Sequence, residues 1–566
     1  MAHEHDLDQV AQRYLEELLA LDPIFATYYG ARDFDDQLTD FSPDGVTART
    51  NARQALAKAT RHIVAKNDAE AVALDSISDY LSLHDELDAA EVFASDLNVI
   101  ESPLQSIRSI FDLMPRATPE DWAHIAHRME AVPSSLQGYQ TSLEYGRAKQ
   151  LVAAKRQVRE VASQCDHYGG KDQEGFFQSL AAEGARVAPE LGEELLASAT
   201  HASESFLAFG NYLRETYLPS AQEQDGVGEL RWKLWCRNFN GEAFDPVDAY
   251  AYGWEELHRL TTEMNAIVRE LGLAEDLSGT YRALDLDASR TIVGVDAFRD
   301  WNQGLLDDTI RVLDGTHFDI PAPVKVVEAM IAPPGGAAAM YYTAPSEDFS
   351  RPGRTWYPTL GNTVFPLWHE MSTAYHEGAP GHHLQLAYTT WLGARLNPFQ
   401  RTLVHYSGHV EGWALYAERL ADELGLFPDP AYRLGMYASQ VFRTVRVVID
   451  IGLHHGFIIP AAAPLHGGTP WTPEIGVDYL QRFGGLNEAF ARSEIDRYLG
   501  WPAQATSYKL GERVWLEVRD NVRRSQGAAF SLKGFHMEAF GLGMVSLSQL
   551  RNHAFAAGDP TADHSS

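Results

Sequence analysis

Three histidines and one glutamate lie within eight positions of the segment AYHEGAPGHHLQ, residues 374–385. They are His376, Glu377, His382 and His383. Imidazole nitrogens are common zinc ligands, and a glutamate beside a catalytic zinc ion can take a proton from a water molecule. The helical zinc motif H-E-x-x-H places its two histidines one turn apart. The present segment departs from that motif, because the next histidines follow His376 by six and seven positions.

A regular helix would hold these histidines too far apart to share one ion. At about 100° and 1.5 Å per residue, six steps place His382 roughly 120° around the helix from His376. Seven steps return His383 to the same face, about 10 Å along the axis. Since a Zn–N bond is only about 2.0–2.1 Å long, neither pair can bind one zinc ion on an unbroken helix.

The residues between the histidines predict a break in the helix. Pro380 has no N–H to donate to the carbonyl of His376, and its ring would clash with that carbonyl. Gly378 and Gly381 permit backbone angles that other residues avoid. We therefore expect a kink that brings His382 toward His376. A helix-terminating turn with packed histidines is the alternative interpretation.

A third ligand is expected from the next helix, SGHVEGWALYAERLADELG, residues 407–425. An Asn-Pro pair before it predicts a turn between two antiparallel helices. Counting outward from that turn places Glu411 level with His383, and Glu418 level with His376. We expect Glu411 to be the metal ligand, because the kink shifts the site toward the second histidine. Glu418 would then support the site or bind substrate, and the reverse assignment is the alternative.

The segment QVFRTVRVVIDIGLHHGF, residues 440–457, carries a polar stripe on an otherwise apolar helix. Its members are Arg443, Arg446, Asp450 and His454, at spacings of three, four and four. A buried polar stripe is costly unless its members bind one another or a ligand. The pattern is compatible with a structural network or with a role in the site. In the second case Arg446 would bind a substrate carboxylate through two parallel hydrogen bonds, or His454 would orient the metal ligands.

Four sequence blocks occur together in this chain: AYHEGAPGHHLQ, EGWALYAE, RVVIDIGLH and YLGWPAQATSYKLGE. In this combination the chain resembles the bacterial domain-of-unknown-function family 885 over nearly its full length. That family is similar in pattern to the helical gluzincin metallopeptidases of the thimet-oligopeptidase and angiotensin-converting-enzyme type. The resemblance implies an α-helical, two-lobed fold around a central cleft.

The same resemblance implies roles for individual residues. One zinc ion would be bound by His376, His382 and Glu411, and Glu377 would be the general base. The expanded spacing between the histidines leaves His383 open as the second ligand.

The segment EIDRYLGWPAQATSYKLG, residues 494–511, offers a donor for an oxyanion and groups for substrate binding. In the similar metallopeptidases a tyrosine from the C-terminal part donates to the developing oxyanion. We expect Tyr508 to take this role, with Tyr498 as the alternative, and Arg497 and Tyr498 to contact substrate. Tyrosines are also frequent in cores, so packing is the competing interpretation.

The elements that position these motifs are expected to be helices. In the first segment, residues 7–19, apolar side chains recur at spacings of three and four. A capping oxygen followed by proline predicts a helix start at residues 42–43, 118–119, 245–246 and 472–473. Alternating strand patterns are scarce, so we predict an all-α protein with at most a small β-hairpin.

A stretch rich in proline, glycine and aromatic residues, 333–362, interrupts the helical texture. Loops of such length are often functional. We place a boundary there, between an N-terminal helical half (1–332) and a C-terminal half (333–557) that carries the expected metal site. The tail, 558–566, is expected to be disordered.

The composition bears on partners and compartment. The chain has 566 residues, of which 46 are basic and 78 acidic, so its formal charge is 46 − 78 = −32. A surface this acidic argues against binding nucleic acid or an anionic membrane. Only two cysteines occur, Cys165 and Cys236, and we find neither a secretory signal nor a run of about 18 apolar residues. We therefore expect a cytoplasmic protein.

Together these patterns predict a zinc-dependent metallohydrolase that cleaves peptide or other amide bonds through a metal-activated water. Its partner would be a peptide or a small amide substrate. One alternative is a non-catalytic helical binding protein. A second is a helical di-iron oxidase, which would need two Glu-x-x-His motifs on facing helices. The chain offers Glu255 and His258 at this spacing, without a second copy in a suitable place.

Overall fold

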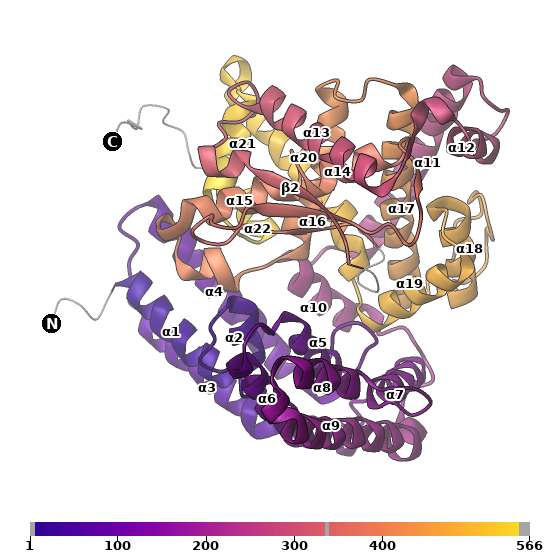
Figure 1. Cartoon of the computed structure of the whole chain (residues 1–566). Helices are drawn as coiled ribbons and strands as arrows, with labels where there is room; N and C mark the ends of the chain where they lie inside the picture. Colours follow the sequence, from indigo (N-terminus) through magenta and orange to yellow (C-terminus); the bar gives the residue numbers. More distant parts are fainter. Residues whose placement is uncertain (1–5, 334–338, 554–566) are drawn as a thin grey trace. The chain divides into compact units, whose positions relative to one another are not determined.

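The computed structural model describes residues 6–333 and 339–553, and the predicted disordered tail lies outside them. Within the described residues the chain is mainly helical, with two small sheets (Figure 1). The helical class expected from the sequence is therefore confirmed. The described residues divide into two compact units, each considered by itself. The first unit comprises 6–65, 78–227 and 493–501, and the second comprises 66–77, 228–492 and 502–553.

The first unit is built from helices around one apolar core. Trp122, Phe177 and Phe206 lie in that core with no exposed surface. The longest helix, α6, packs against α9, which also contacts α7 and α8. The helices are α1 (Leu7–Leu21), α2 (Pro23–Tyr29), α3 (Pro43–Thr60), α5 (Pro103–Leu113), α6 (Pro119–Ala148), α7 (Lys155–Gly169), α8 (Phe176–Val187) and α9 (Gly192–Tyr212). Two further helices, α4 (Asp68–Ala89) and α19 (Glu488–Gly500), are divided between the units.

The second unit contains the segments that the sequence singles out for chemistry. Its helices are α10 (Gly228–Asn240), α11 (Pro246–Leu271), α12 (Leu277–Asp285), α13 (Val295–Leu313), α14 (Glu370–Glu377), α15 (His382–Leu392), α16 (Ser407–Glu423), α17 (Pro430–His455), α18 (Pro473–Gly484), α20 (Ser507–Gln526), α21 (Leu532–Gly541) and α22 (Leu547–His553). Helix α14 packs against α16 and α17, and α15 packs against α16. These contacts bring the histidine-rich segment to the glutamates of α16 and the arginines of α17.

Short 3-10 and π turns connect the longer elements. They are η1 (Val92–Ser95), η2 (Pro189–Leu191), η3 (Leu213–Tyr217), η4 (Leu218–Ser220), η5 (Ala288–Arg290), η6 (Ala322–Lys325), η7 (Gly393–Arg395), η8 (Phe399–Leu403), η9 (Gln504–Thr506) and η10 (Gly527–Ala529).

The predicted helix starts are confirmed at all four positions. Ser42, Thr118, Asp245 and Thr472 are the N-caps of α3, α6, α11 and α18, and each side chain accepts a backbone N–H of the first turn. Each cap is followed by proline, whose missing N–H costs nothing at the first helical position. The apolar stripe of α1 is buried as expected.

Two sheets in the second unit correct the prediction of at most a small β-hairpin. Strands β1 (Thr291–Val293) and β5 (Val364–Pro366) pair antiparallel, with Ile292 opposite Phe365. The second sheet has the order β2 (Val327–Ile331), β4 (Gly353–Tyr357), β3 (Tyr341–Thr343); β2 is parallel to β4, and β3 is antiparallel to it. Strands of three to five residues are too short to show a clear alternation, which is why the sequence pattern missed them.

The boundary predicted at residues 332 and 333 falls inside the second unit. Strand β2 precedes this point, and β3, β4 and β5 follow it. Because the later strands pair with β1 and β2, the described part of this stretch belongs to the fold of the unit and does not connect two domains.

Candidate metal centre

The helix break expected between the histidines is present. Helix α14 ends at Glu377 and α15 begins at His382. Glycine is required on both sides of the break. A Cβ on Gly381 would lie 1.9 Å from the carbonyl oxygen of His376, and a Cβ on Gly378 would lie 2.7 Å from the carbonyl oxygen of Ala374. The close backbone approach that these glycines permit accompanies the meeting of His376 and His382, whose ring centroids lie 4.8 Å apart.

The break is tied to α16 by one side chain. The indole N–H of Trp413 lies 3.0 Å from the carbonyl oxygen of Pro380 and 3.2 Å from that of Gly381. Trp413 itself is fully buried. Both carbonyls lie in the turn between α14 and α15, where that of Gly381 also accepts from the backbone N–H of Gln385. A buried carbonyl needs a hydrogen-bond donor. Trp413 supplies that donor and fixes the break relative to the helix that carries Glu411.

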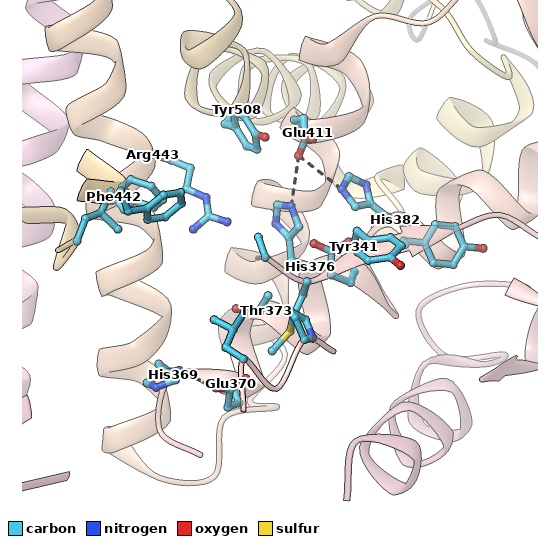
Figure 2. A pocket seen from close by; sticks show the side chains of 18 of the residues that line it. Tyr341, His369, Glu370, Thr373, His376, His382, Glu411, Phe442, Arg443 and Tyr508 are labelled. Carbon is cyan, nitrogen blue, oxygen red and sulfur yellow. Dashed lines mark hydrogen bonds and ion pairs between the residues drawn. The ribbon is translucent and has the colours of Figure 1, made fainter. Parts of the chain in front are cut away.

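Two imidazoles converge on one carboxylate oxygen. Oε2 of Glu411 lies 3.3 Å from Nε2 of His376 and 3.5 Å from Nε2 of His382 (Figure 2). One candidate ligand atom from each of His376, Glu377 and His382 lies within 4.8 Å of the others. The break in the helix therefore allows His376 and His382, six residues apart, to join one compact cluster.

These distances suit a zinc ion. Two ligands bound tetrahedrally at Zn–ligand distances of about 2.0–2.2 Å lie about 3.3–3.5 Å apart. The two measured separations, 3.3 and 3.5 Å, fall in that interval. They are longer than the usual 2.7–3.2 Å of a direct N–H···O hydrogen bond. A set of two nitrogens and one oxygen is also a common donor set for zinc. His376, His382 and Glu411 therefore fit the metal that the sequence predicts.

A second carboxylate, that of Glu418, binds the other ring nitrogen of His376. Nδ1 of His376 donates to Oε1 of Glu418 over 2.8 Å, and the other oxygen of Glu418 accepts from the hydroxyl of Ser372 at 2.7 Å. Glu418 is completely buried. Such a carboxylate fixes the tautomer of a metal-binding imidazole and directs its other nitrogen toward the ion. The structure thus brings Glu411 to both imidazoles and places Glu418 behind one of them.

His383 lies in a different environment. Its Nε2 donates to the carbonyl oxygen of Val324 over 2.8 Å, and its Nδ1 lies 3.0 Å from the hydroxyl of Tyr342. Burial lowers the pKa of His383 to about 4. Both ring nitrogens are therefore occupied by η6 and β3, and His383 does not join the cluster.

His454 also lies apart from the cluster. It is buried, with Nε2 3.9 Å from Oδ2 of Asp450. Asp450 accepts hydrogen bonds from the indole of Trp232 at 2.7 Å and from the backbone N–H of Ala503 at 3.2 Å. His454 is thus part of a buried polar network inside the second unit.

The cluster opens into a cavity of about 770 Å³ within the second unit. His376, Glu377, His382 and Glu411 line it, together with two arginines and several aromatic side chains. Burial raises the pKa of the Glu377 carboxyl group, with the imidazoles opposing this and the carboxylate of Glu411 reinforcing it. The cavity is large enough to hold a small peptide or a molecule of drug size beside the cluster.

Tyr508 and Arg446 line the same cavity. The guanidinium of Arg446 lies over the ring of Tyr508 at 4.9 Å and over the ring of Phe442 at 4.1 Å. Tyr508 and Glu411 occupy the same end of the pocket in Figure 2. The cavity beside the cluster is therefore lined by the hydroxyl-bearing side chain of Tyr508 and by the positively charged side chain of Arg446.

Arg497 and Tyr498 belong to the first unit. Both bind Glu494: Arg497 donates to its two oxygens at 3.0 and 2.9 Å, and the hydroxyl of Tyr498 donates over 2.8 Å. Neither of them is among the residues that line the cavity. Two residues without a predicted role also line the cavity, Arg443 of the polar stripe and Glu370.

Comparison with known proteins gives a family and a fold. Residues 23–553 match the model of a family described as "Bacterial protein of unknown function (DUF885)". The chain belongs to this family. No curated protein matches it.

Two solved structures resemble this DUF885 protein along its length. The first is described as a putative lipoprotein from Colwellia psychrerythraea, with a TM-score of 0.81, 21% identity, and coverage of 97% of this chain and 98% of the other. The second is a putative lipoprotein of unknown function from Shewanella oneidensis, with a TM-score of 0.74, 16% identity, and coverage of 97% and 99%. At these identities the likeness shows a shared fold.

The prediction of a cytoplasmic protein is corrected by these comparisons. Both similar structures are described as putative lipoproteins, and lipidation attaches a protein to a membrane. The prediction depended on few cysteines and on finding neither a secretory signal nor a long apolar run. A small number of cysteines indicates few disulfides and does not specify a compartment. None of the helices among residues 6–333 and 339–553 has the length and apolar composition required to cross a membrane.

Proposed function

We propose that this DUF885 protein is a zinc-dependent hydrolase of peptide or other amide bonds. The convergence of His376, His382 and Glu411 at zinc-compatible distances carries the proposal. Three protein ligands leave a fourth position for water or substrate, which is typical of catalytic zinc sites, whereas structural sites usually use four protein ligands. The cavity beside the cluster supplies room for a substrate.

Kinship with the helical gluzincin peptidases is part of the same proposal. It is supported by the order of the groups along the chain, a His-Glu pair followed by a second histidine and then by a glutamate on the next helix. It is also supported by the mainly helical fold of the unit that carries them.

In the proposed hydrolysis Glu377, Tyr508 and Glu418 have separate roles. Zinc, when bound, lowers the pKa of a water molecule and polarises a substrate carbonyl. Glu377 takes a proton from the attacking water and delivers it to the leaving amine. The hydroxyl of Tyr508 donates to the oxyanion that develops on the carbonyl oxygen. Glu418 keeps the ring of His376 in one tautomer and one orientation.

Metal analysis combined with one substitution tests the proposal. We expect about one zinc ion per chain, and cleavage products from a peptide library. Glu377→Gln should retain zinc and lose cleavage by about 10²-fold or more, because a general acid–base group contributes 10²–10⁴-fold. Glu488→Gln, an exposed carboxylate on α19, is the matched control and should behave as wild type.

Other results would contradict parts of this proposal. Full cleavage by Glu377→Gln would remove Glu377 from the mechanism. Failure to bind zinc, with no cleavage, would favour a non-catalytic binding protein. Two iron atoms per chain in place of zinc would favour the oxidase.

A further inference from the structure

Arg443 on α17 reaches into the cavity from the wall opposite the cluster. Figure 2 shows its guanidinium directed toward His376 across the pocket. No carboxylate among residues 6–333 and 339–553 forms an ion pair with it. An arginine inside a cavity, with no carboxylate at ion-pair distance, is available to an anionic ligand.

Arg443 is held at a fixed place relative to His376 by a chain of hydrogen bonds. Its Nη1 donates to the hydroxyl of Ser439 over 2.9 Å, and that hydroxyl lies 3.4 Å from Oε1 of Glu418. The same carboxylate oxygen accepts from Nδ1 of His376 at 2.8 Å. The arginine and the histidine therefore share one buried carboxylate as a common support, which preserves their spacing.

One donor of Arg443 lacks a protein acceptor. Nε is buried and has no hydrogen-bond partner within the described residues. A buried donor without an acceptor destabilises the structure. A ligand carboxylate in the cavity can instead accept from the two terminal nitrogens in parallel, which is a planar geometry that arginine offers to carboxylates.

The wall next to Arg443 is apolar. The guanidinium of Arg443 lies 5.4 Å from the ring centroid of Phe442 and 5.9 Å from that of Tyr508, and Leu486 and Phe490 line the same cavity. The second arginine there, Arg446, stacks on Phe442 and Tyr508 and adds positive charge. The combination of a carboxylate binder with an apolar surface suits an amino acid that has a free carboxylate and a large apolar side chain.

We propose that Arg443 binds the free C-terminal carboxylate of the substrate, and that the adjacent apolar wall takes the side chain of its last residue. The inference rests on the proposed hydrolase and names its substrate class: peptides or N-acyl amino acids cleaved close to a free carboxyl end. Hydrolysis breaks the amide C–N bond, adds the hydroxyl of water to the acyl carbon and its hydrogen to the amine. No other reactant is needed.

A matched pair of substrates tests this assignment. The probes are N-benzoyl-glycyl-phenylalanine and its C-terminal amide, which differ in charge and little in shape. We expect the zinc-loaded wild type to cleave the acid with kcat/KM about 10- to 100-fold above that for the amide, which corresponds to a lost charge-assisted hydrogen bond. Arg443→Gln should lose this preference because kcat/KM falls for the acid and not for the amide. Arg443→Lys should retain part of the preference.

Arg433→Gln is the control on the same helix. Arg433 is paired with Asp422 at 2.8 Å and does not line the cavity, so both probes should be cleaved as by wild type. Equal kcat/KM for acid and amide in the wild type, or an unchanged preference in Arg443→Gln, would overturn the assignment of Arg443 and leave the proposed hydrolase standing.

Binding measured without turnover separates the two proposals. Calorimetry would compare the two probes on zinc-loaded Glu377→Gln and on the same variant with Arg443→Gln added. Tighter binding of the acid that is lost with Arg443 supports the carboxylate site, even if the wild type cleaves neither probe. Binding of the acid that does not depend on Arg443, or no binding, overturns it.

Discussion

His376 makes a different contact with each of its ring nitrogens. Nε2 faces Glu411 in the cluster, while Nδ1 donates to Glu418, a carboxylate with no exposed surface. Burying a carboxylate is costly unless it is hydrogen-bonded, and Glu418 also accepts from Ser372 at 2.7 Å. The arrangement makes the basicity and the direction of one imidazole of the proposed zinc site depend on a residue outside the cluster.

Glu418→Gln should therefore weaken zinc binding although Glu418 does not belong to the proposed ligand set. Loss of the negative charge behind His376 lowers the basicity of the imidazole, and partners of this kind change metal affinity by about 10- to 100-fold. Competition with a calibrated chelator measures the affinity. Ser372→Ala, which removes one hydrogen bond to the same carboxylate, should have a smaller effect. An unchanged affinity in Glu418→Gln would show that the ring is held by packing alone.

Residue spacing predicts some of this site and fails for the rest. The break between the histidines follows from Pro380 and its flanking glycines, and a hairpin count places Glu411 near them. The same count cannot decide between His382 and His383, because their separation depends on the direction in which α15 leaves the break. The polar stripe on α17 likewise cannot show that Arg443 is directed into the cavity. The cavity wall opposite Arg443 is built from segments far away in the sequence.

At the scale of elements, the break between α14 and α15 determines the geometry of the cluster. Gly381→Ala should disrupt it, because the new Cβ would lie 1.9 Å from the carbonyl oxygen of His376. We expect a loss of unfolding free energy of about 1–3 kcal/mol, as in overpacked cores, together with weaker zinc binding. Urea unfolding and chelator competition measure the two effects.

Gly304→Ala is the matched control in α13. That glycine is exposed within a helix, and no atom lies within 4 Å of the position of a new Cβ. The substitution should stabilise the protein by about 0.5–1 kcal/mol, because alanine loses less backbone entropy in a helix. Equal unfolding free energies and equal zinc affinities of Gly381→Ala and Gly304→Ala would mean that the close approach at the break does not constrain the cluster.

For the whole molecule, the helices follow from local signals and the sheets and compartment do not. A capping side chain and a proline suffice to begin α3, α6, α11 and α18, since both act within one turn. Strand β2 pairs with β4 across more than twenty residues, and no local pattern of five residues encodes that partner. A small number of cysteines does not specify a compartment, so it could not reveal the lipoprotein description of the similar structures.

The stability of the folded chain should fall in mild acid through a buried histidine of α21, His536, which does not belong to the cluster. His536 stacks on Phe318 at a ring separation of 4.9 Å, and its Nε2 lies 2.8 Å from the hydroxyl of Tyr416, which also accepts from Arg519. Burial, reinforced by the charges of Arg519 and His317, lowers the pKa of His536 to about 3. In the unfolded chain the pKa of histidine is about 6.5.

The unfolded state therefore binds more protons than the folded state in the interval between these two pKa values. The contribution of His536 is fully present above about pH 6.5 and is lost as the pH falls toward 3, by about 2 kcal/mol between pH 7.5 and 5.0. His536→Gln cannot titrate, so its unfolding free energy should decrease by about 2 kcal/mol less over the same interval. Urea unfolding at the two pH values, followed by tryptophan fluorescence, measures both proteins. An equal decrease in the two would show that His536 is protonated within the folded state.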